Sequence, residues 1–239
     1  MPYYEHTSID IDDQTIALHP IIDACDGSIA YRLLEHIGFP CIGKTILDVG
    51  AGTGQMCRLL RGFPGVVVEA CDLDPQSEAL FRQSPELKPI PFHRVDILSQ
   101  SFSRPYDAAV ARGVYHHIAK SDRPRFLKTL TDLAPIVIIA DEGIREYSSE
   151  DERLRNCETW YGYVIGEARR RKIESLALIE TEYLKHEQLG NADDGGDYKE
   201  SPSHLIQDAA KVNLKPVSVD RYGPWKETGG GFFTATFVR

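Results

Sequence analysis

The sequence predicts an α/β fold in which a doubly wound, mostly parallel sheet of seven strands ends in an antiparallel C-terminal hairpin. Three observations lead to this prediction. Short apolar runs that are typical of buried strands alternate with stretches of helical periodicity. A glycine-rich turn, Gly50-Ala51-Gly52-Thr53-Gly54, joins the first of these strands to a helix. Roughly seventy residues of helical character then separate the fifth strand from the sixth, far more than an ordinary connection.

The first forty residues are expected to be helical. Their apolar residues recur near the helical period, at Ile16, Leu18, Ile21, Ile22, Cys25, Ile29, Leu33, Leu34 and Ile37. Gly38-Phe39-Pro40 is the expected stop signal. We therefore expect residues 1–40 to form a helical cap on a core of residues 41–142.

The core is expected to contain five short, apolar strands, at residues 45–49, 66–71, 90–95, 106–111 and 136–140. Helices are expected between them at residues 55–61, 75–82 and 122–133, and the last of these spans Asp122 to Leu133. Strands that alternate with helices form a parallel sheet with both faces covered. In such sheets ligands bind beyond the carboxyl ends of the strands, near the switch in strand order. Polar residues at strand ends are therefore the functional candidates.

Residues 143–214 are expected to form a helical insert that covers the site as a lid. An amphipathic helix is marked by Leu154, Cys157, Tyr161, Val164, Ile165 and Ala168, and further helices are expected at residues 173–184 and 203–212. The Gly-, Asn- and Asp-rich residues 190–197 predict a loop. Strands at residues 217–219 and 232–238 are expected to form the terminal hairpin within residues 215–239. Without an internal repeat or a domain-sized linker, we expect one domain over residues 1–239.

The spacing of the glycine loop narrows the class of ligand. A loop that follows a strand and opens a helix suits a nucleotide-type ligand, because glycine lets the backbone approach it closely. Dinucleotide enzymes use G-x-G-x-x-G, which places a pyrophosphate at the helix start. This chain has G-x-G-x-G, directly preceded by Val49 and the acid Asp48. A carboxylate there would repel pyrophosphate but suits a ligand that carries ammonium and sulfonium charges.

Two more acids follow at the next strand ends. Asp72 ends the second strand and can accept hydrogen bonds from both hydroxyls of a ribose. Asp74 stands before Pro75 and is expected to cap the following helix. Asp96 and Ile97 close the third strand, where an adenine needs a polar partner and an apolar wall.

These segments resemble the class I, Rossmann-like S-adenosylmethionine-dependent methyltransferases. The resemblance rests on residues 46–54, 70–75, 95–97 and 106–118, covers about residues 44–142 well and extends loosely to the hairpin. It implies S-adenosyl-L-methionine as the cofactor, with a methionine subsite, a ribose subsite and an adenine subsite. The residues implied are Gly50 and Gly52 with Arg112 and Gly113 at the methionine and sulfonium, Asp72 at the ribose, and Asp96 and Ile97 at the adenine. Ala51 and Leu73 are expected to bind the cofactor as well.

His116 and His117 follow the fourth strand, where the resemblance places residues that face the methyl group. A histidine there can take a proton from an acceptor hydroxyl or amine. Adjacent residues point in different directions, so we expect at most one to be catalytic. His116 is expected to pack or to cap a helix, which leaves His117 as the stronger candidate.

Three further residues, Tyr115, Glu142 and Tyr161, are expected near the substrate. Magnesium-dependent catechol-type relatives carry an acid at the end of the fourth strand, whereas this chain has Arg112 there, so no metal is expected.

The composition restricts the classes of molecule that the protein is expected to bind and the compartment in which it is expected to work. The chain has 36 acidic and 27 basic residues among 239, a formal net charge of −9, which disfavours a nucleic-acid partner. Five cysteines without a C-x-x-C pair argue against a disulfide framework and a zinc knuckle. With neither a secretion signal nor an apolar run of membrane-spanning length, the expectation is a cytoplasmic protein that does not contact a membrane.

The expected activity is in-line methyl transfer to an O, N or C atom of a small molecule. Three alternatives stay open: a protein of this fold that binds the cofactor without transferring methyl, a methyltransferase for a protein or an RNA, and, less compatible with the glycine spacing, an NAD-dependent dehydrogenase. The acceptor and the oligomeric state, a homodimer included, are not fixed by the sequence.

Overall fold

The structure is a computed structural model, and it describes residues 14–99, 102, 105–189 and 198–239. The loop expected at residues 190–197 and the first part of the expected cap, residues 1–13, lie outside the described residues. Seven strands in the described part form one mixed sheet: β1 (Thr45–Val49), β2 (Val67–Asp72), β3 (Phe92–Arg94), β4 (Ala108–Arg112), β5 (Ile136–Gly143), β6 (Pro216–Trp225) and β7 (Gly230–Val238).

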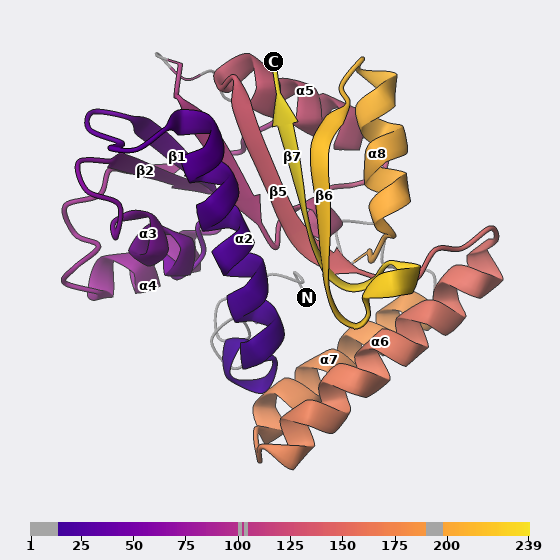
Figure 1. Cartoon of the computed structure of the whole chain (residues 1–239). Helices are drawn as coiled ribbons and strands as arrows, with labels where there is room; N and C mark the ends of the chain where they lie inside the picture. Colours follow the sequence, from indigo (N-terminus) through magenta and orange to yellow (C-terminus); the bar gives the residue numbers. More distant parts are fainter. Residues whose placement is uncertain (1–13, 100–101, 103–104, 190–197) are drawn as a thin grey trace.

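The sheet has the strand order β3-β2-β1-β4-β5-β7-β6 (Figure 1). Its first five strands are parallel to one another. β7 lies antiparallel to β5, from Ile136↔Val238 to Gly143↔Gly231, and β6 lies antiparallel to β7. The expected α/β fold with an antiparallel terminal hairpin is therefore confirmed. Strand order reverses at β1, whose neighbours are β2 on one side and β4 on the other.

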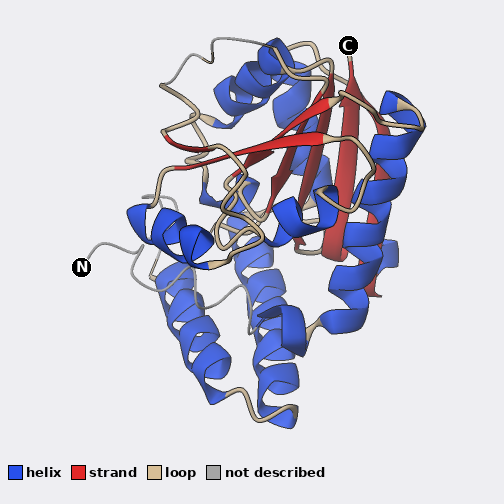
Figure 2. Cartoon of the chain, turned by 90° about the vertical axis from the view of Figure 1, so that its left-hand side faces the viewer, coloured by secondary structure: helices blue, strands red, loops and turns tan. Residues whose placement is uncertain are grey.

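Helices cover both faces of this sheet, as Figure 2 shows. They are α2 (His19–Ile37), α3 (Gln55–Leu60), α4 (Pro75–Gln83), α5 (Arg123–Leu133), α6 (Glu150–Arg170), α7 (Glu174–Gln188) and α8 (Pro202–Lys211), with the short 3-10 helices η2 (Tyr115–His117) and η3 (Lys226–Thr228). The alternation of side chains along each strand divides the core between the two faces. In β5, Ile138 and Ala140 pack with residues of α2, α3 and α6, whereas Val137 and Ile139 pack with residues of α5 and α8.

The expected helical insert is present, with α6 and α7 packed side by side (Figure 1). α6 begins at the N-cap Ser149, whose side chain accepts a hydrogen bond from the backbone N–H of Glu152. Its buried residues Cys157, Tyr161, Val164 and Ala168 follow the spacing that predicted an amphipathic helix.

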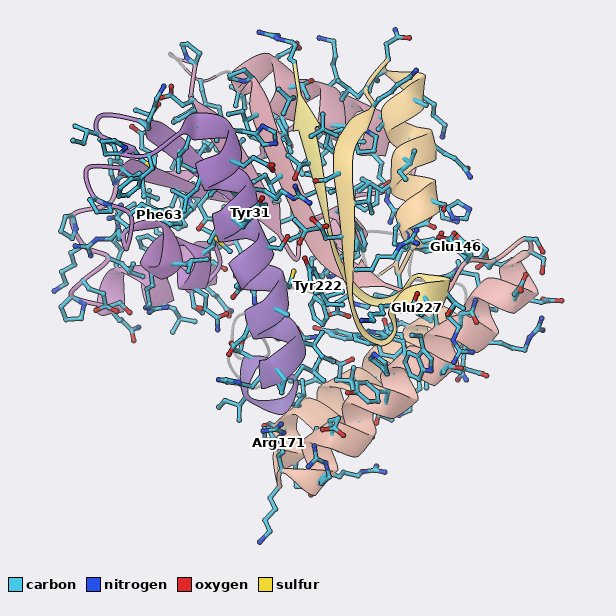
Figure 3. The ribbon with its side chains drawn as sticks, viewed as in Figure 1. Tyr31, Phe63, Glu146, Arg171, Tyr222 and Glu227 are labelled. Atoms are coloured by element: carbon cyan, nitrogen blue, oxygen red, sulfur yellow. The ribbon has the colours of Figure 1, made fainter. Side chains whose placement is uncertain are left out.

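Elements differ from their expected bounds where tertiary contacts decide them. β5 continues to Gly143 because β7 pairs with it along its whole length. β6 is longer than expected for the same reason, and its register against β7 is irregular between Tyr222 and Trp225. Figure 3 marks Glu146, which follows β5 and lies close to α8; it accepts hydrogen bonds from the hydroxyls of Ser201, at 2.7 Å, and Ser203, at 2.8 Å.

Candidate cofactor and methyl-acceptor site

The glycine loop leaves β1 at the reversal of strand order. Gly50, Gly52 and Gly54 all have positive φ, at 66°, 52° and 87°, which side-chain-bearing residues rarely adopt. A Cβ on Gly50 would lie 2.3 Å from a methyl carbon of Val114. The backbone N–H groups of Gly50 and Ala51 donate to the carbonyl of Cys71, at 2.8 and 3.0 Å, which fixes the loop beside β2.

A pocket opens at this loop between β1 and β4. It encloses about 270 Å³, including space that is open to solvent. Its lining combines glycine-loop backbone with one acid, one base, two uncharged polar side chains and one thioether: Asp48, Gly50, Ala51, Thr53, Gln55, Met56 and Arg112. A cavity with mixed polar lining therefore lies at the switch in strand order, where ligands bind in sheets of this kind.

Asp48 lines this pocket and is 1% exposed. The thiol of Cys57, on α3, donates to its Oδ2 at 3.0 Å. Burial raises the pKa of the Asp48 carboxyl to about 7, and the nearby Asp72 charge acts in the same direction, against the lowering effect of the Cys57 bond and of Arg112. The carboxyl thus titrates near neutral pH.

Asp72 ends β2 beside the glycine loop. Its Oδ2 accepts from the backbone N–H of Gly52 at 2.8 Å, and its Oδ1 accepts from that of Asp74 at 2.9 Å. Burial raises the pKa of the Asp72 carboxyl, opposed by these backbone hydrogen bonds. The Leu73 side chain is 55% exposed next to it. Asp74 caps α4 as expected, because its carboxylate accepts from the backbone N–H groups of residues 76 and 77.

Asp96 and Ile97 follow β3 rather than ending it, since the strand stops at Arg94. The backbone N–H of Val95 donates to the carbonyl of Asp72 at 2.9 Å, so this segment runs directly past the end of β2. The Asp96 carboxylate accepts from the backbone N–H of Leu98 at 2.8 Å, and Ile97 is buried.

Arg112 is the last residue of β4 and lines the pocket. Its Nε donates to Oδ1 of Asp26, on α2, at 2.7 Å. Gly113 follows with a positive φ of 68°. The cap helix α2 is thereby connected to the β4 side of the pocket.

His116 and His117 form η2 with Tyr115, just beyond β4. Nδ1 of His116 makes a short hydrogen bond with Oδ1 of Asp141, on β5, and the backbone N–H of His116 donates to Oδ2 of the same carboxylate at 3.2 Å. Burial opposes ionisation of Asp141, but the adjacent His116 outweighs it and lowers the pKa of this carboxyl. The ring of His117 lies 3.9 Å from that of His116, centroid to centroid.

The three expected substrate residues are dispersed. The hydroxyl of Tyr115 donates to Asp208 of α8 at 2.6 Å, and Tyr115 packs with the core on the α5 and α8 side of the sheet. Tyr161 lies on α6, within the insert itself, and is buried.

Glu142 lies on β5, where several elements converge. It accepts from Nε1 of Trp160 at 2.8 Å, pairs with Nζ of Lys199 at 2.7 Å, and receives the side-chain amide of Gln14. Gln14 belongs to the N-terminal cap, whose next residue, Thr15, donates its hydroxyl to Gln55 at 3.0 Å. The cap therefore contacts both the pocket-lining residue Gln55 and, on β5, Glu142.

Two residues of this region carry a signal that the sequence reasoning did not use. Thr53 lies within the glycine loop, and in the described part of the chain its buried hydroxyl oxygen has no hydrogen-bond partner. Asp26 lies in the middle of α2, far from any motif, so only the fold reveals its contact with Arg112.

Among the described residues no group of three or more His, Cys, Asp or Glu side chains could hold a metal ion. The five cysteines are buried free thiols. None of the helices in the described part has the length and apolar character needed to cross a membrane.

Residues 46–134 match a family model described as Methyltransferase domain. No curated protein sequence matches the chain significantly. Among solved structures, a TehB-like SAM-dependent methyltransferase from Corynebacterium glutamicum is 17% identical with a TM-score of 0.54, over 87% of this chain and 85% of that one. Magnesium protoporphyrin IX methyltransferase from Synechocystis, with bound SAH, is 12% identical with a TM-score of 0.58, over 91% and 82%.

The mitomycin 7-O-methyltransferase MmcR is 15% identical with a TM-score of 0.59; the match covers 99% of this chain and 58% of that one. Identities this low establish the fold, and the matched family model supplies the activity class. The fold is that of the class I S-adenosylmethionine-dependent methyltransferases, and residues 46–134 match the methyltransferase-domain model.

Proposed function

We propose that this enzyme transfers a methyl group to a small-molecule acceptor that binds beyond the end of β4, under the N-terminal cap and the α6–α7 insert. The observation that carries the proposal is the polar pocket at the β1–β4 switch, with buried Asp48 in its lining and Asp72 at the neighbouring strand end. The buried face of α6 and the contact of Gln14 with Glu142 support an enclosed acceptor site, which favours small molecules over macromolecules.

The residues of the pocket fit S-adenosylmethionine. We assign the methionine and sulfonium part to the glycine loop (Gly50, Ala51, Gly52), to Asp48, and to Arg112 with Gly113. Asp72 is assigned to the ribose hydroxyls, since each of its two oxygens, which already accept one backbone N–H, can accept a second hydrogen bond.

The adenine is assigned to the space between exposed Leu73 and the Asp96–Ile97 segment, which runs past the end of β2. Leu73 and Ile97 would supply apolar contact with the ring, and Asp96 a polar partner for its edge.

Bound S-adenosylmethionine supplies a methyl group that is already activated by the sulfonium charge. The protein must then position the acceptor, exclude water and remove a proton where the acceptor carries one. We propose His116 as the group that takes this proton. Its contact with Asp141 supports His116 over His117: an ionised carboxylate at Nδ1 fixes the orientation of the ring and stabilises its protonated form. Because Nδ1 is bonded to Asp141, we assign the proton transfer from the acceptor to Nε2.

Two of the similar structures are named for small-molecule substrates, mitomycin and magnesium protoporphyrin IX. This likeness of fold supports the choice of a small molecule and leaves its identity open.

The test is release of S-adenosylhomocysteine from S-adenosylmethionine in the presence of a panel of hydroxylated and amino-bearing small molecules. With the best acceptor, His116→Asn should lower kcat by about 10²–10⁴-fold without changing cofactor affinity, and His117→Asn is the matched control. Turnover that His116→Asn leaves intact would contradict the assignment of the base. Absence of turnover with every small acceptor, but turnover with a protein or RNA, would contradict the substrate class.

A further inference from the structure

Residues 198–201, which precede α8, form a short strap beside the carboxyl end of β5. The carbonyl of Glu200 accepts from the backbone N–H of Ile144, just after β5, at 3.1 Å. At the start of the strap, the backbone N–H of Tyr198 donates to the carbonyl of His116 at 3.0 Å. The strap therefore contacts both the histidine and the end of the strand that carries its acid.

Lys199 lies within the strap and is 2% exposed. Its backbone is held by both helices of the insert. The carbonyl of Lys199 accepts from Nη1 of Arg153, on α6, at 3.3 Å, and its N–H donates to Oε1 of Glu187, on α7, at 3.2 Å. Arg153 and Glu187 also pair with each other at 2.6 Å, and both are buried. The insert helices therefore determine where the Lys199 side chain leaves the strap.

The Lys199 ammonium is directed to the neighbour of Asp141. Its Nζ pairs with Oε2 of Glu142, the next residue of β5, at 2.7 Å. The backbone N–H of Glu142 donates at 2.7 Å to Oδ1 of Asp141, the oxygen that bonds His116. Burial raises the pKa of the Asp141 carboxyl, and against it the adjacent His116 and then the charge of Lys199 lower this pKa. A buried cation therefore acts on the His116–Asp141 pair from the strap.

The other charged groups around the pair, in the described part of the chain, have carboxylate partners. Arg123, on α5, pairs with Glu200 at 2.7 Å, and Arg112, at the end of β4, pairs with Asp26 at 2.7 Å. The remaining ionisable groups near the pair are the Cys25 thiol of α2, whose pKa burial raises to about 12, the Tyr198 phenol, whose pKa burial also raises, and the His117 imidazole of η2. The Lys199–Glu142 ion pair differs from all of these, because Glu142 is the sequence neighbour of Asp141.

We propose that Lys199 is a positioning residue of the His116–Asp141 pair, and that through it the insert sets the pH range in which His116 takes a proton. The inference rests on the proposed function, in which His116 removes the proton of the acceptor. An ionised carboxylate at Nδ1 favours the protonated imidazole, whereas a nearby cation disfavours it. Lys199 thus offsets Asp141 and keeps His116 unprotonated, and so able to act as a base, at neutral pH.

The experiment is an NMR titration of the His116 imidazole in the full, ligand-free chain, with the signal assigned by its loss in His116→Asn. Lys199→Met removes a cation and should raise the midpoint of His116 protonation by roughly one pH unit. Glu142→Gln removes an anion and should lower it. Lys199→Arg, which keeps the charge, is the matched control and should leave the midpoint in place.

The double variant Lys199→Met/Glu142→Gln guards against loss of the fold, because it leaves no buried carboxylate without its partner. Its midpoint should lie close to that of the wild type and therefore above that of Glu142→Gln alone. A role of Lys199 in packing alone would not give opposite signs to the two single substitutions.

The pH profile of kcat, measured with S-adenosylmethionine and the best acceptor of the panel, is the second readout. Its lower midpoint should shift in the same direction as the NMR midpoint in each variant. Unchanged NMR midpoints in Lys199→Met and Glu142→Gln, or shifts of the same sign, would overturn the inference. NMR midpoints that shift as expected while the kcat profile does not follow would support the role of Lys199 and refute instead the proposed role of His116 as the base.

Discussion

Neutralising Asp48 should stabilise the ligand-free protein, and increasingly so as the pH rises. The carboxyl is 1% exposed, and burial raises its pKa from the ordinary 3.8 to about 7. Because the folded-state pKa is the higher one, the group contributes its full stability only below about pH 3.8. That contribution declines as the pH rises to about 7 and is completely lost above it.

The size of the effect follows from the interval between these two pKa values. At 1.36 kcal/mol per pH unit, an interval of about 3 units corresponds to roughly 4 kcal/mol between the two extremes of pH. At pH 5 the folded carboxyl is still protonated, so part of the cost has yet to appear. Relative to the wild type, Asp48→Asn should therefore gain about 2–3 kcal/mol between pH 5 and pH 8.

Urea unfolding of both proteins at pH 5, 6, 7 and 8, without ligand, measures this difference directly. Asp107→Asn is a matched control of opposite sign. The pKa of Asp107 is lowered, because hydrogen bonds from the Thr45 backbone and from Lys44 outweigh the effect of burial. Its neutralisation should lower the free energy of unfolding by about the same amount at every pH from 5 to 8, because a carboxyl with a lowered pKa is ionised over this whole range. If the stability difference between Asp48→Asn and the wild type is independent of pH, the Asp48 carboxyl is not held near neutral pKa and the reasoning is wrong.

Three further substitutions test the scaffold of the site. Arg123→Met should lower the free energy of unfolding by about 3–5 kcal/mol in chemical denaturation, because it leaves the buried carboxylate of Glu200 without its 2.7 Å partner; adding Glu200→Gln should restore part of the loss. Gly50→Ala should lower the free energy of unfolding by about 1–3 kcal/mol because of the positive φ, and further because the added Cβ contacts Val114. Adding Val114→Ala should remove only the loss that comes from this contact, which paired melting curves of the two variants measure. Asp74→Ala should cost about 1 kcal/mol by loss of the α4 cap, without a change in affinity for S-adenosylhomocysteine in calorimetry.

The cofactor half of the site was predictable from the sequence because each of its residues is local to a strand end. A parallel sheet brings consecutive strand ends to one edge, so Asp48, Asp72 and the Asp96–Ile97 segment converge once the strands are recognised. The glycine spacing then indicates the ligand class from the backbone alone.

The long-range contacts around the site could not be predicted in the same way. Asp26 contacts Arg112 across 86 positions of sequence, and Gln14 contacts Glu142 across 128, so neither pairing leaves a local pattern. Tyr115 was expected near the substrate because it follows β4, but the turn of η2 directs its hydroxyl to α8.

The sequence alone also could not show which of the two histidines contacts an acid. Sequence reasoning favoured His117, since nothing in the pattern indicates which ring meets an acid. The contact of His116 with Asp141 depends on the register of β4 and β5 and on the turn that follows β4. A histidine pair at a strand end therefore predicts a location for proton transfer, and only the fold shows that the ring of His116 contacts Asp141.

A crystal structure of the protein with S-adenosylhomocysteine bound tests the central claim most directly. The account predicts one nucleoside at the glycine loop, with its ribose hydroxyls on the carboxylate of Asp72, its adenine beside Ile97 and its amino-acid end against Arg112. Density for the nucleoside away from the β1–β4 switch, or at the switch with the adenine in the place assigned to the methionine part, would contradict it.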